Sequence, residues 1–217
     1  MKNILLLGMA LGVVCTVAAV VLGFAEIKTR EQRYEARREG ELEAIKSILP
    51  EFDNNPLQDK SKVLVDDVEV IIMQAKKEGA IIAYAVQSAA QGYGGKVETV
   101  AGIKPDGEIL HVIVLPGHEE TPGLGSVATD RRQRKTIYDI LGKSAREETE
   151  NGLPPSPYLD QFNQYNLLHK TEYRISQDTG EIDAVSGATI TSRAVAKAVT
   201  RAAIAFKEYK SGQGISE

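Results

Sequence analysis

The sequence of 217 residues contains a single cysteine, Cys15, and it lies inside an apolar N-terminal run. The rest of the chain therefore offers no disulfide and no thiolate ligands for an iron–sulfur cluster or a zinc ribbon. The three histidines, His111, His118 and His169, are scattered without the spacing of a metal site. Any redox chemistry must therefore come from a different kind of cofactor.

An excess of positive charge is also absent. The chain has 26 Lys and Arg residues against 30 Asp and Glu residues and a formal net charge of -4, and no block of like charges stands out as a binding tail. We therefore expect no nucleic-acid partner. The hydrophobic content of 42% is too high for a disordered chain and predicts one medium-sized domain with an additional segment.

A long uncharged run occupies residues 4–25. A helix of that length spans about 33 Å, enough to cross the apolar core of a bilayer. A cleaved signal peptide is the alternative, because Met1 and Lys2 give a short basic start. The run is longer than a usual signal-peptide core and has no clear A-x-A cleavage site. We expect residues 1–25 to be a transmembrane anchor that stays in place.

The segment after the anchor is rich in Glu, Arg, Lys and Ala. A narrow apolar stripe, formed by Leu42, Ile45, Ile48 and Leu49, predicts that the helix continues as an amphipathic stalk until Pro50 ends it. Residues 51–62 are typical of a linker. The predicted organisation is therefore an anchor at 1–25, a helical stalk and linker at 26–62, and a globular domain at 63–217.

The globular part begins with runs of β-forming residues. We expect strands at 68–73, 81–86, 96–100 and 109–115 and short strands at 173–175 and 182–185, with a further short helix at 136–141. The turns at 76–79 and 104–107 favour antiparallel hairpins over βαβ units. Together with a C-terminal helix, this pattern predicts an α+β domain.

The C-terminal helix is predicted from Arg193 onward, with apolar residues at helical spacing: Val195, Ala198, Val199, Ala202 and Phe206. A run of small and polar residues, 186–192, precedes it. Its Ser and Thr residues are typical of helix caps, but a helix N-terminus also suits an anion such as a phosphate. Gly187 permits a backbone turn that residues with a side chain rarely adopt. The small size of Gly187 and Ala188 leaves the Thr189 hydroxyl accessible.

The segment Ser186-Gly187-Ala188-Thr189-Ile190-Thr191-Ser192 resembles the flavinylation motif of FMN-binding domains in the RnfG and NqrC subunits of ion-translocating oxidoreductases. The resemblance implies that Thr189 carries FMN through a phosphoester bond. Two glycine-rich connections, 92–95 and 119–125, read alone as ordinary turns, but they resemble the same family in the same order. In that family the segment matching 120–125 lines the flavin site. The candidate cofactor-binding residues are Thr189, Ser186, Gly187, Ala188, Thr121, Leu124, Gly125 and Tyr93.

An isolated threonine hydroxyl is a poor nucleophile, and no His or Lys base lies close to Thr189 in sequence. The resemblance implies an ApbE-type flavin transferase, which moves FMN from FAD onto the threonine with the help of magnesium. The bound flavin then performs the electron chemistry, so no catalytic dyad is expected. Asp183 either positions the motif or is simply a residue at a strand end.

The resemblance implies an electron carrier in a membrane-bound Rnf-type complex, which couples electron transfer between ferredoxin and NAD to ion translocation. The length of the chain fits RnfG better than NqrC. One alternative is a membrane-tethered FMN-binding sensor or accessory module outside an ion pump. Another is a non-redox scaffold in which Thr189 only caps a helix.

Two arguments about topology disagree. Five basic residues follow the anchor, at 28, 30, 33, 37 and 38, while only Lys2 precedes it, so the positive-inside rule places the globular domain in the cytoplasm. The resemblance implies a single-pass protein of the cell inner membrane whose soluble domain lies on the periplasmic side, where the transferase works. We follow the resemblance, because the rule is a statistical bias.

Overall fold

A computed structural model describes residues 2–116, 120–121, 123–131 and 153–213. The expected helix at 136–141 and His118 lie outside these residues. The chain divides into two compact units, residues 1–40 and 41–217, and each is described by itself. The first unit is helical and belongs to α1 (Lys2–Ile48). Its stretch Leu6–Arg30, with a mean hydropathy of 2.5, is long and apolar enough to cross a membrane.

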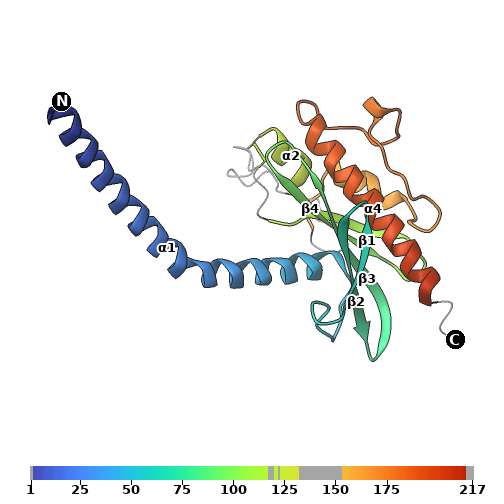
Figure 1. Ribbon diagram of the computed structural model, residues 1–217. Helices are drawn as coiled ribbons and strands as arrows, with labels where there is room; N and C mark the ends of the chain where they lie inside the picture. The colour runs from blue at the N-terminus through green and yellow to red at the C-terminus, as the bar shows by residue number, and fades with distance from the viewer. Residues whose placement is uncertain (1, 117–119, 122, 132–152, 214–217) are drawn as a thin grey trace, which may run out of the picture. The chain divides into compact units, whose positions relative to one another are not determined.

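The second unit is built on a five-stranded antiparallel sheet with the strand order β1-β2-β3-β4-β5 (Figure 1). The strands are β1 (Lys60–Val65), β2 (Val68–Lys77), β3 (Ala80–Gln91), β4 (Lys96–Ile103) and β5 (Ile109–Val114). The predicted antiparallel hairpins are confirmed. Strand β1 was not expected, and it begins within the segment that the sequence assigns to the linker.

One face of the sheet is covered by α4 (Thr189–Gln213), which lies along it in Figure 1. All five apolar residues of the stripe predicted for this helix are buried, and they share a core with alternate residues of β3 such as Tyr84 and Val86. The helix begins four residues earlier than Arg193. The α+β class with an antiparallel sheet and a C-terminal helix is therefore confirmed.

The opposite face of the sheet is covered by the last turns of α1. Ile45, Ile48 and Leu49 of the predicted stalk stripe are buried there, in a second apolar cluster with alternate sheet residues. Gly102 of β4 permits this close approach, because a Cβ atom there would lie 2.8 Å from the Ile48 carbonyl oxygen. The helix ends at Ile48, two residues before Pro50.

The prediction of strands at 173–175 and 182–185 is wrong. The two segments share only one isolated bridge, between Ile175 and Ile182, and the short 3-10 helix η2 (Ser176–Asp178) lies between them. The backbone groups bond locally or to α4: the Gly180 amide donates to the Ile175 carbonyl (2.9 Å), and the Tyr173 amide donates to Thr200 Oγ1 (2.9 Å). These bonds leave no extended ladder.

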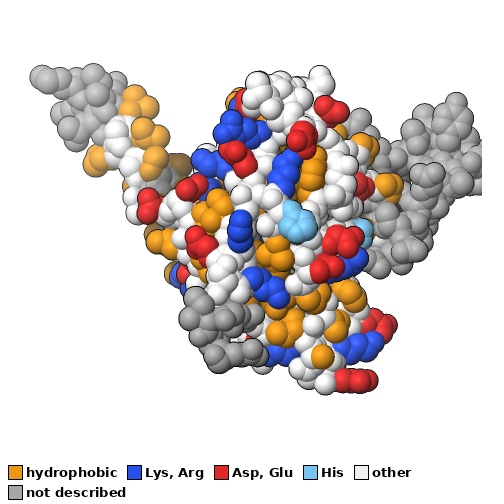
Figure 2. Space-filling view, turned by 90° about the vertical axis from the view of Figure 1, so that its right-hand side faces the viewer, with side chains coloured by type: hydrophobic (Ala, Val, Ile, Leu, Met, Phe, Trp, Pro, Cys, Tyr) orange, Lys and Arg blue, Asp and Glu red, His pale blue; other side chains and the backbone are white. Residues whose placement is uncertain are grey.

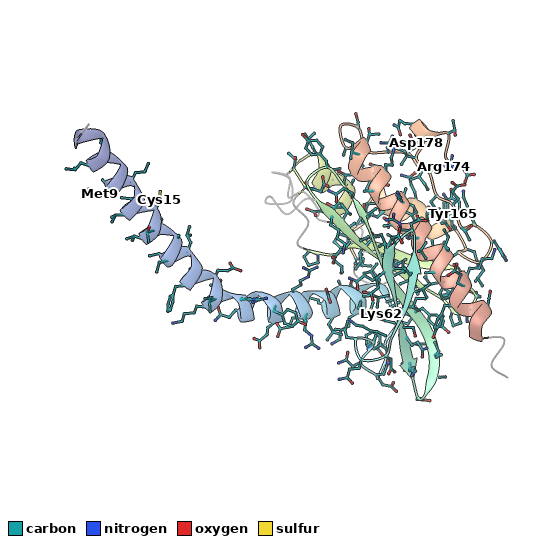
Figure 3. The ribbon with its side chains drawn as sticks, viewed as in Figure 1. Met9, Cys15, Lys62, Tyr165, Arg174 and Asp178 are labelled. Carbon is teal, nitrogen blue, oxygen red and sulfur yellow. The ribbon has the colours of Figure 1, made fainter. Side chains whose placement is uncertain are left out.

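Charges of both signs are interspersed on the face drawn in Figure 2. Acids and bases of the second unit also form ion pairs. Arg174 pairs with Glu172, and Arg193, close to the start of α4, pairs with Asp178 of η2. Figure 3 shows Arg174 and Asp178 close to the end of α4 where the helix begins. The Arg193–Asp178 pair thus ties η2 to the first turns of α4.

Candidate functional site

A cavity of about 550 Å³ lies where three segments meet. They are the turn between β3 and β4, the loop that leads into the short helix α2 (Gly125–Thr129), and the start of α4. The lining residues are Tyr93, Glu120, Thr121, Leu124, Gly125, Gly187, Ala188, Thr189, Ile190 and Thr191. Seven of the eight candidate residues from the sequence are therefore brought together. Ser186 is exposed and does not belong to the lining.

The backbone before α4 turns sharply at Gly187. This residue has a φ of 79°, which residues with a side chain rarely adopt, as expected from the sequence. The Ala188 amide donates to the Val185 carbonyl (3.0 Å), and the Ser192 amide donates to the Ala188 carbonyl (2.9 Å) as the helix begins. The amides of residues 189–191 precede that bond, so they have no acceptor within the helix. Thr189 is the first helical residue.

Two hydroxyl groups of the motif are buried and engaged in holding the structure. Thr191 Oγ1 donates to Glu120 Oε2 (2.7 Å). Ser192 Oγ accepts from the Val185 amide (3.1 Å). Because both side chains are almost completely buried, neither hydroxyl is open to a reagent from solvent.

The other two hydroxyl groups belong to Ser186 and Thr189. Within the described part of the chain, neither of them has a hydrogen-bond partner. Ser186 lies outside the cavity lining, whereas Thr189 is half-buried and lines the cavity. Thr189 is therefore the hydroxyl of the motif that is both unengaged and open to the cavity.

Asp183 is held through its backbone. Its amide donates to Gln161 Oε1 (2.7 Å), and Gln161 Nε2 donates to its carbonyl (3.0 Å). The Asp183 side chain is exposed. The residue therefore positions the chain before the motif through main-chain contacts with η1 (Leu159–Gln164).

Three lining residues were not singled out from the sequence: Glu120, Ile190 and Thr191. Glu120 is only 7% exposed. Its Oε1 atom accepts from the amides of Tyr93 (3.1 Å) and Gly94 (3.3 Å), and its Oε2 atom accepts from Thr191. Glu120 belongs to the 120–125 segment that resembles the family, which is the signal available in the sequence. A glutamate in a loop is exposed by default, so its burial could not be predicted.

The rim of the cavity is apolar and open. Tyr93 is 71% exposed, Leu124 50% and Ile190 49%, and large apolar side chains exposed around a cavity are typical of a ligand site. The volume of the cavity also lies within the range of small-molecule sites. Among the described residues, no group of three or more His, Cys, Asp or Glu side chains could hold a metal ion. An apolar rim beside a helix N-terminus fits an aromatic cofactor that carries a phosphate.

Comparison with known proteins decides the family. A family model described as an FMN-binding domain matches residues 92–204, just over half of the chain, and this span contains all three segments of the cavity. The chain belongs to the FMN-binding domain family. The membership confirms the family that the motif at 186–192 resembles.

Proteins named as the G subunit of an ion-translocating oxidoreductase complex, RnfG, resemble most of the chain. The protein of Stutzerimonas stutzeri is 32% identical over 89% of this chain and 77% of its own length. That of Haemophilus influenzae is 31% identical over 91% of this chain and 87% of its own length. The protein of Cereibacter sphaeroides is 30% identical over 94% of this chain and 84% of its own length. The chain therefore belongs to the RnfG family.

Among solved structures, the C subunit of a Na⁺-translocating NADH-quinone reductase from Parabacteroides distasonis resembles this FMN-binding chain. Its identity is 16% and its TM-score is 0.36, over 65% of this chain and 61% of that one.

Proposed function

We propose that this chain is the covalently flavinylated electron carrier of an Rnf-type ion-translocating oxidoreductase, with FMN joined to Thr189 by a phosphoester. Membership of the FMN-binding and RnfG families supports the cofactor and the complex. The assignment of Thr189 as the attachment site rests on one observation. Its hydroxyl lines the cavity without a hydrogen-bond partner among the described residues, whereas the hydroxyls of Thr191 and Ser192 form hydrogen bonds. A sensor outside an ion pump is not favoured, because the relatives belong to an ion-translocating complex.

Attachment converts the Thr189 hydroxyl into a phosphoester. The hydroxyl oxygen attacks the phosphorus on the FMN side of the FAD pyrophosphate, the bridging P–O bond breaks, AMP leaves, and the hydroxyl proton passes to a base. Among the described lining residues there is no His or Lys. We therefore assign the base and the magnesium ion to an ApbE-type flavin transferase. The small residues Gly187 and Ala188 leave the hydroxyl open to that enzyme.

The chain's own residues hold the cofactor. The amides of the first turn of α4 suit the phosphate, because they lack intrahelical acceptors and lie at the positive end of the helix dipole. The apolar rim of Tyr93, Leu124 and Ile190 suits the ring system. FMN supplies the electron chemistry, and the protein supplies its position and electrostatic surroundings.

The location of the domain is part of the proposal. The apolar helix and the membership of a membrane complex support a membrane-anchored protein. We assign a single-pass topology in the inner membrane, with the FMN-binding domain on the periplasmic side, where the transferase works. The partners are the other proteins of the complex, which pass electrons between ferredoxin and NAD and move ions across the membrane.

Removal of the acceptor hydroxyl tests the proposal. Thr189→Ala, expressed with an active transferase, should show no flavin fluorescence in a denaturing gel, and its circular dichroism should match that of the wild type. Thr121→Ala is the matched control, because it removes another cavity-lining hydroxyl and should remain fluorescent. Fluorescence in Thr189→Ala after denaturation would show that the acceptor is another residue.

A further inference from the structure

Glu120 connects all three segments that form the cavity. Glu120 belongs to the loop at 120–125, and its carboxylate accepts hydrogen bonds from the turn at 93–94 and from Thr191 in the first turn of α4. The contacting residues lie 26 to 71 positions away in sequence. Glu120 is also a cavity-lining residue. The shape of the cavity and its electrostatics therefore depend on the same side chain.

Two glycines leave the space that this carboxylate fills. A Cβ atom on Gly92 would collide with Glu120 Oε1, and a Cβ atom on Gly125 would collide with Glu120 Oε2. Gly125 would also place its Cβ atom 3.0 Å from Glu120 Cβ. A side chain at either position would displace the carboxylate. The two glycine-rich loops are thus shaped around Glu120 rather than only turning the chain.

The three contacts suit an ionised carboxylate. Each comes from an N–H or O–H donor, and an ionised carboxylate only accepts hydrogen bonds. The positive end of the α4 dipole lies in the same turn as Thr191 and favours a negative charge. No Lys or Arg side chain is present among the described residues that line the cavity. Among these described lining residues, no cation therefore cancels the negative charge of Glu120.

We propose that Glu120 positions the three segments of the cofactor site and that its negative charge lowers the reduction potential of the flavin. The inference rests on the proposed attachment of FMN to Thr189, which brings the flavin to the cavity that Glu120 lines. Reduction brings additional electron density to the flavin, and a fixed negative charge in a partly desolvated cavity opposes it. A lower reduction potential makes the flavin of this protein a stronger electron donor.

The test is a redox titration of the full-length flavinylated protein in detergent, comparing the wild type with Glu120→Gln. The amide keeps an oxygen for the Tyr93 and Gly94 amides and can donate to the Thr191 hydroxyl, so the geometry is retained. Removing the charge should shift the equilibrium between oxidised and reduced flavin about tenfold toward the reduced form. That shift corresponds to about 30 mV for a two-electron couple.

Two further variants separate charge from geometry. Thr191→Val keeps the carboxylate and removes one of its hydrogen bonds, so it should lower the melting temperature and shift the reduction potential less than Glu120→Gln does. Glu69→Gln removes an exposed carboxylate on β2 that is paired with Lys62. This variant should change neither the melting temperature nor the reduction potential. A potential in Glu120→Gln equal to those of the wild type and Glu69→Gln would overturn the proposal.

The remaining outcomes are also decisive. Failure of Glu120→Gln to fold or to acquire flavin, beside a wild type that does both, would support the positioning role, because the substitution alters only this carboxylate. Absence of covalent flavin from the wild-type protein, produced with an active transferase, would instead refute the proposed function. The two failures are therefore distinguishable in one set of samples.

Discussion

The Tyr158 hydroxyl donates a 2.6 Å hydrogen bond to the backbone carbonyl of Ser192, three residues after the proposed flavin acceptor. Tyr158 is buried, and burial raises the pKa of its phenol well above the ordinary range. The hydroxyl therefore stays protonated at neutral pH and remains a donor. The bond ties the segment before η1 to the first turn of α4.

Tyr158→Phe should destabilise the protein by about 1 kcal/mol, because one buried hydrogen bond is lost while the ring packing is kept. Chemical unfolding of the full-length protein in detergent measures the change. Tyr93→Phe is the matched control: its ring is exposed, so the free energy of unfolding should change by less than about 0.5 kcal/mol. Equal stabilities for the two variants would show that the Tyr158 bond contributes nothing.

Gly187→Val should lose flavin attachment to a greater extent than stability. The left-handed backbone costs a residue with a side chain roughly 1–2 kcal/mol. A Cβ atom at Gly187 would also lie 3.3 Å from Leu124 Cδ2, inside the cavity. In-gel fluorescence and melting temperature, measured on the same preparation, separate the two effects.

Gly79→Val is the matched control for this substitution. Gly79 has nearly the same φ, 81°, and open space around it, and it lies in the turn between β2 and β3. It should show a similar loss of stability with normal flavinylation. Normal flavinylation of Gly187→Val as well would show that the glycine in the motif is incidental.

The ion pair between Asp178 and Arg193 predicts a dependence of stability on pH. Arg193 Nη2 lies 2.8 Å from Asp178 Oδ1, and its guanidinium holds the pKa of Asp178 below the ordinary value of 3.8. Because the pKa is depressed in the folded state, the pair stabilises the protein above pH 3.8. This contribution is lost as the pH falls through the folded-state pKa.

Asp178→Asn should therefore melt at a lower temperature than the wild type at neutral pH, and the difference should vanish as the pH falls below 3.8. Melting curves across this range measure it. Asp183→Asn, at an exposed carboxylate five residues further along, should show no such convergence. A difference for Asp178→Asn that does not change with pH would contradict the assigned role of the pair.

The periodic parts of the fold could be predicted from the sequence, because their residues alternate or repeat as the core requires. Strand β3 places Tyr84 and Val86 on one face of the sheet, and α4 buries its predicted stripe against them. Strand β1 was missed because its exposed positions include Lys60, Lys62 and Leu64, an edge pattern that resembles a linker. The segments at 173–175 and 182–185 were misassigned because bonds to α4 and local turns replaced a ladder.

The candidate site could be predicted only where a short motif carried it. The motif at 186–192 and the two glycine-rich loops gave seven residues that meet at one cavity. The sequence could not show which hydroxyls are engaged, because the partner of Thr191 is a carboxylate 71 positions away. For the same reason it could not reveal that Glu120 fills the space between Gly92 and Gly125.

A reporter fusion tests the topology. Alkaline phosphatase joined after Glu217 should be active, and a cytoplasmic reporter at the same position should be silent, because the domain is proposed to lie in the periplasm. A fusion after Lys2, before the apolar helix, is the control and should give the reverse pattern. Cytoplasmic activity of the Glu217 fusion would contradict both the periplasmic assignment and the route to flavinylation.

Mass spectrometry of the tryptic peptide at residues 175–193 tests the central claim most directly. The peptide lies between Arg174 and Arg193 and contains every hydroxyl of the motif. From a host with an active flavin transferase, it should gain the mass of FMN less one water, and fragmentation should place that mass on Thr189. FMN on Ser186, Thr191 or Ser192, or an unmodified peptide, would contradict the account.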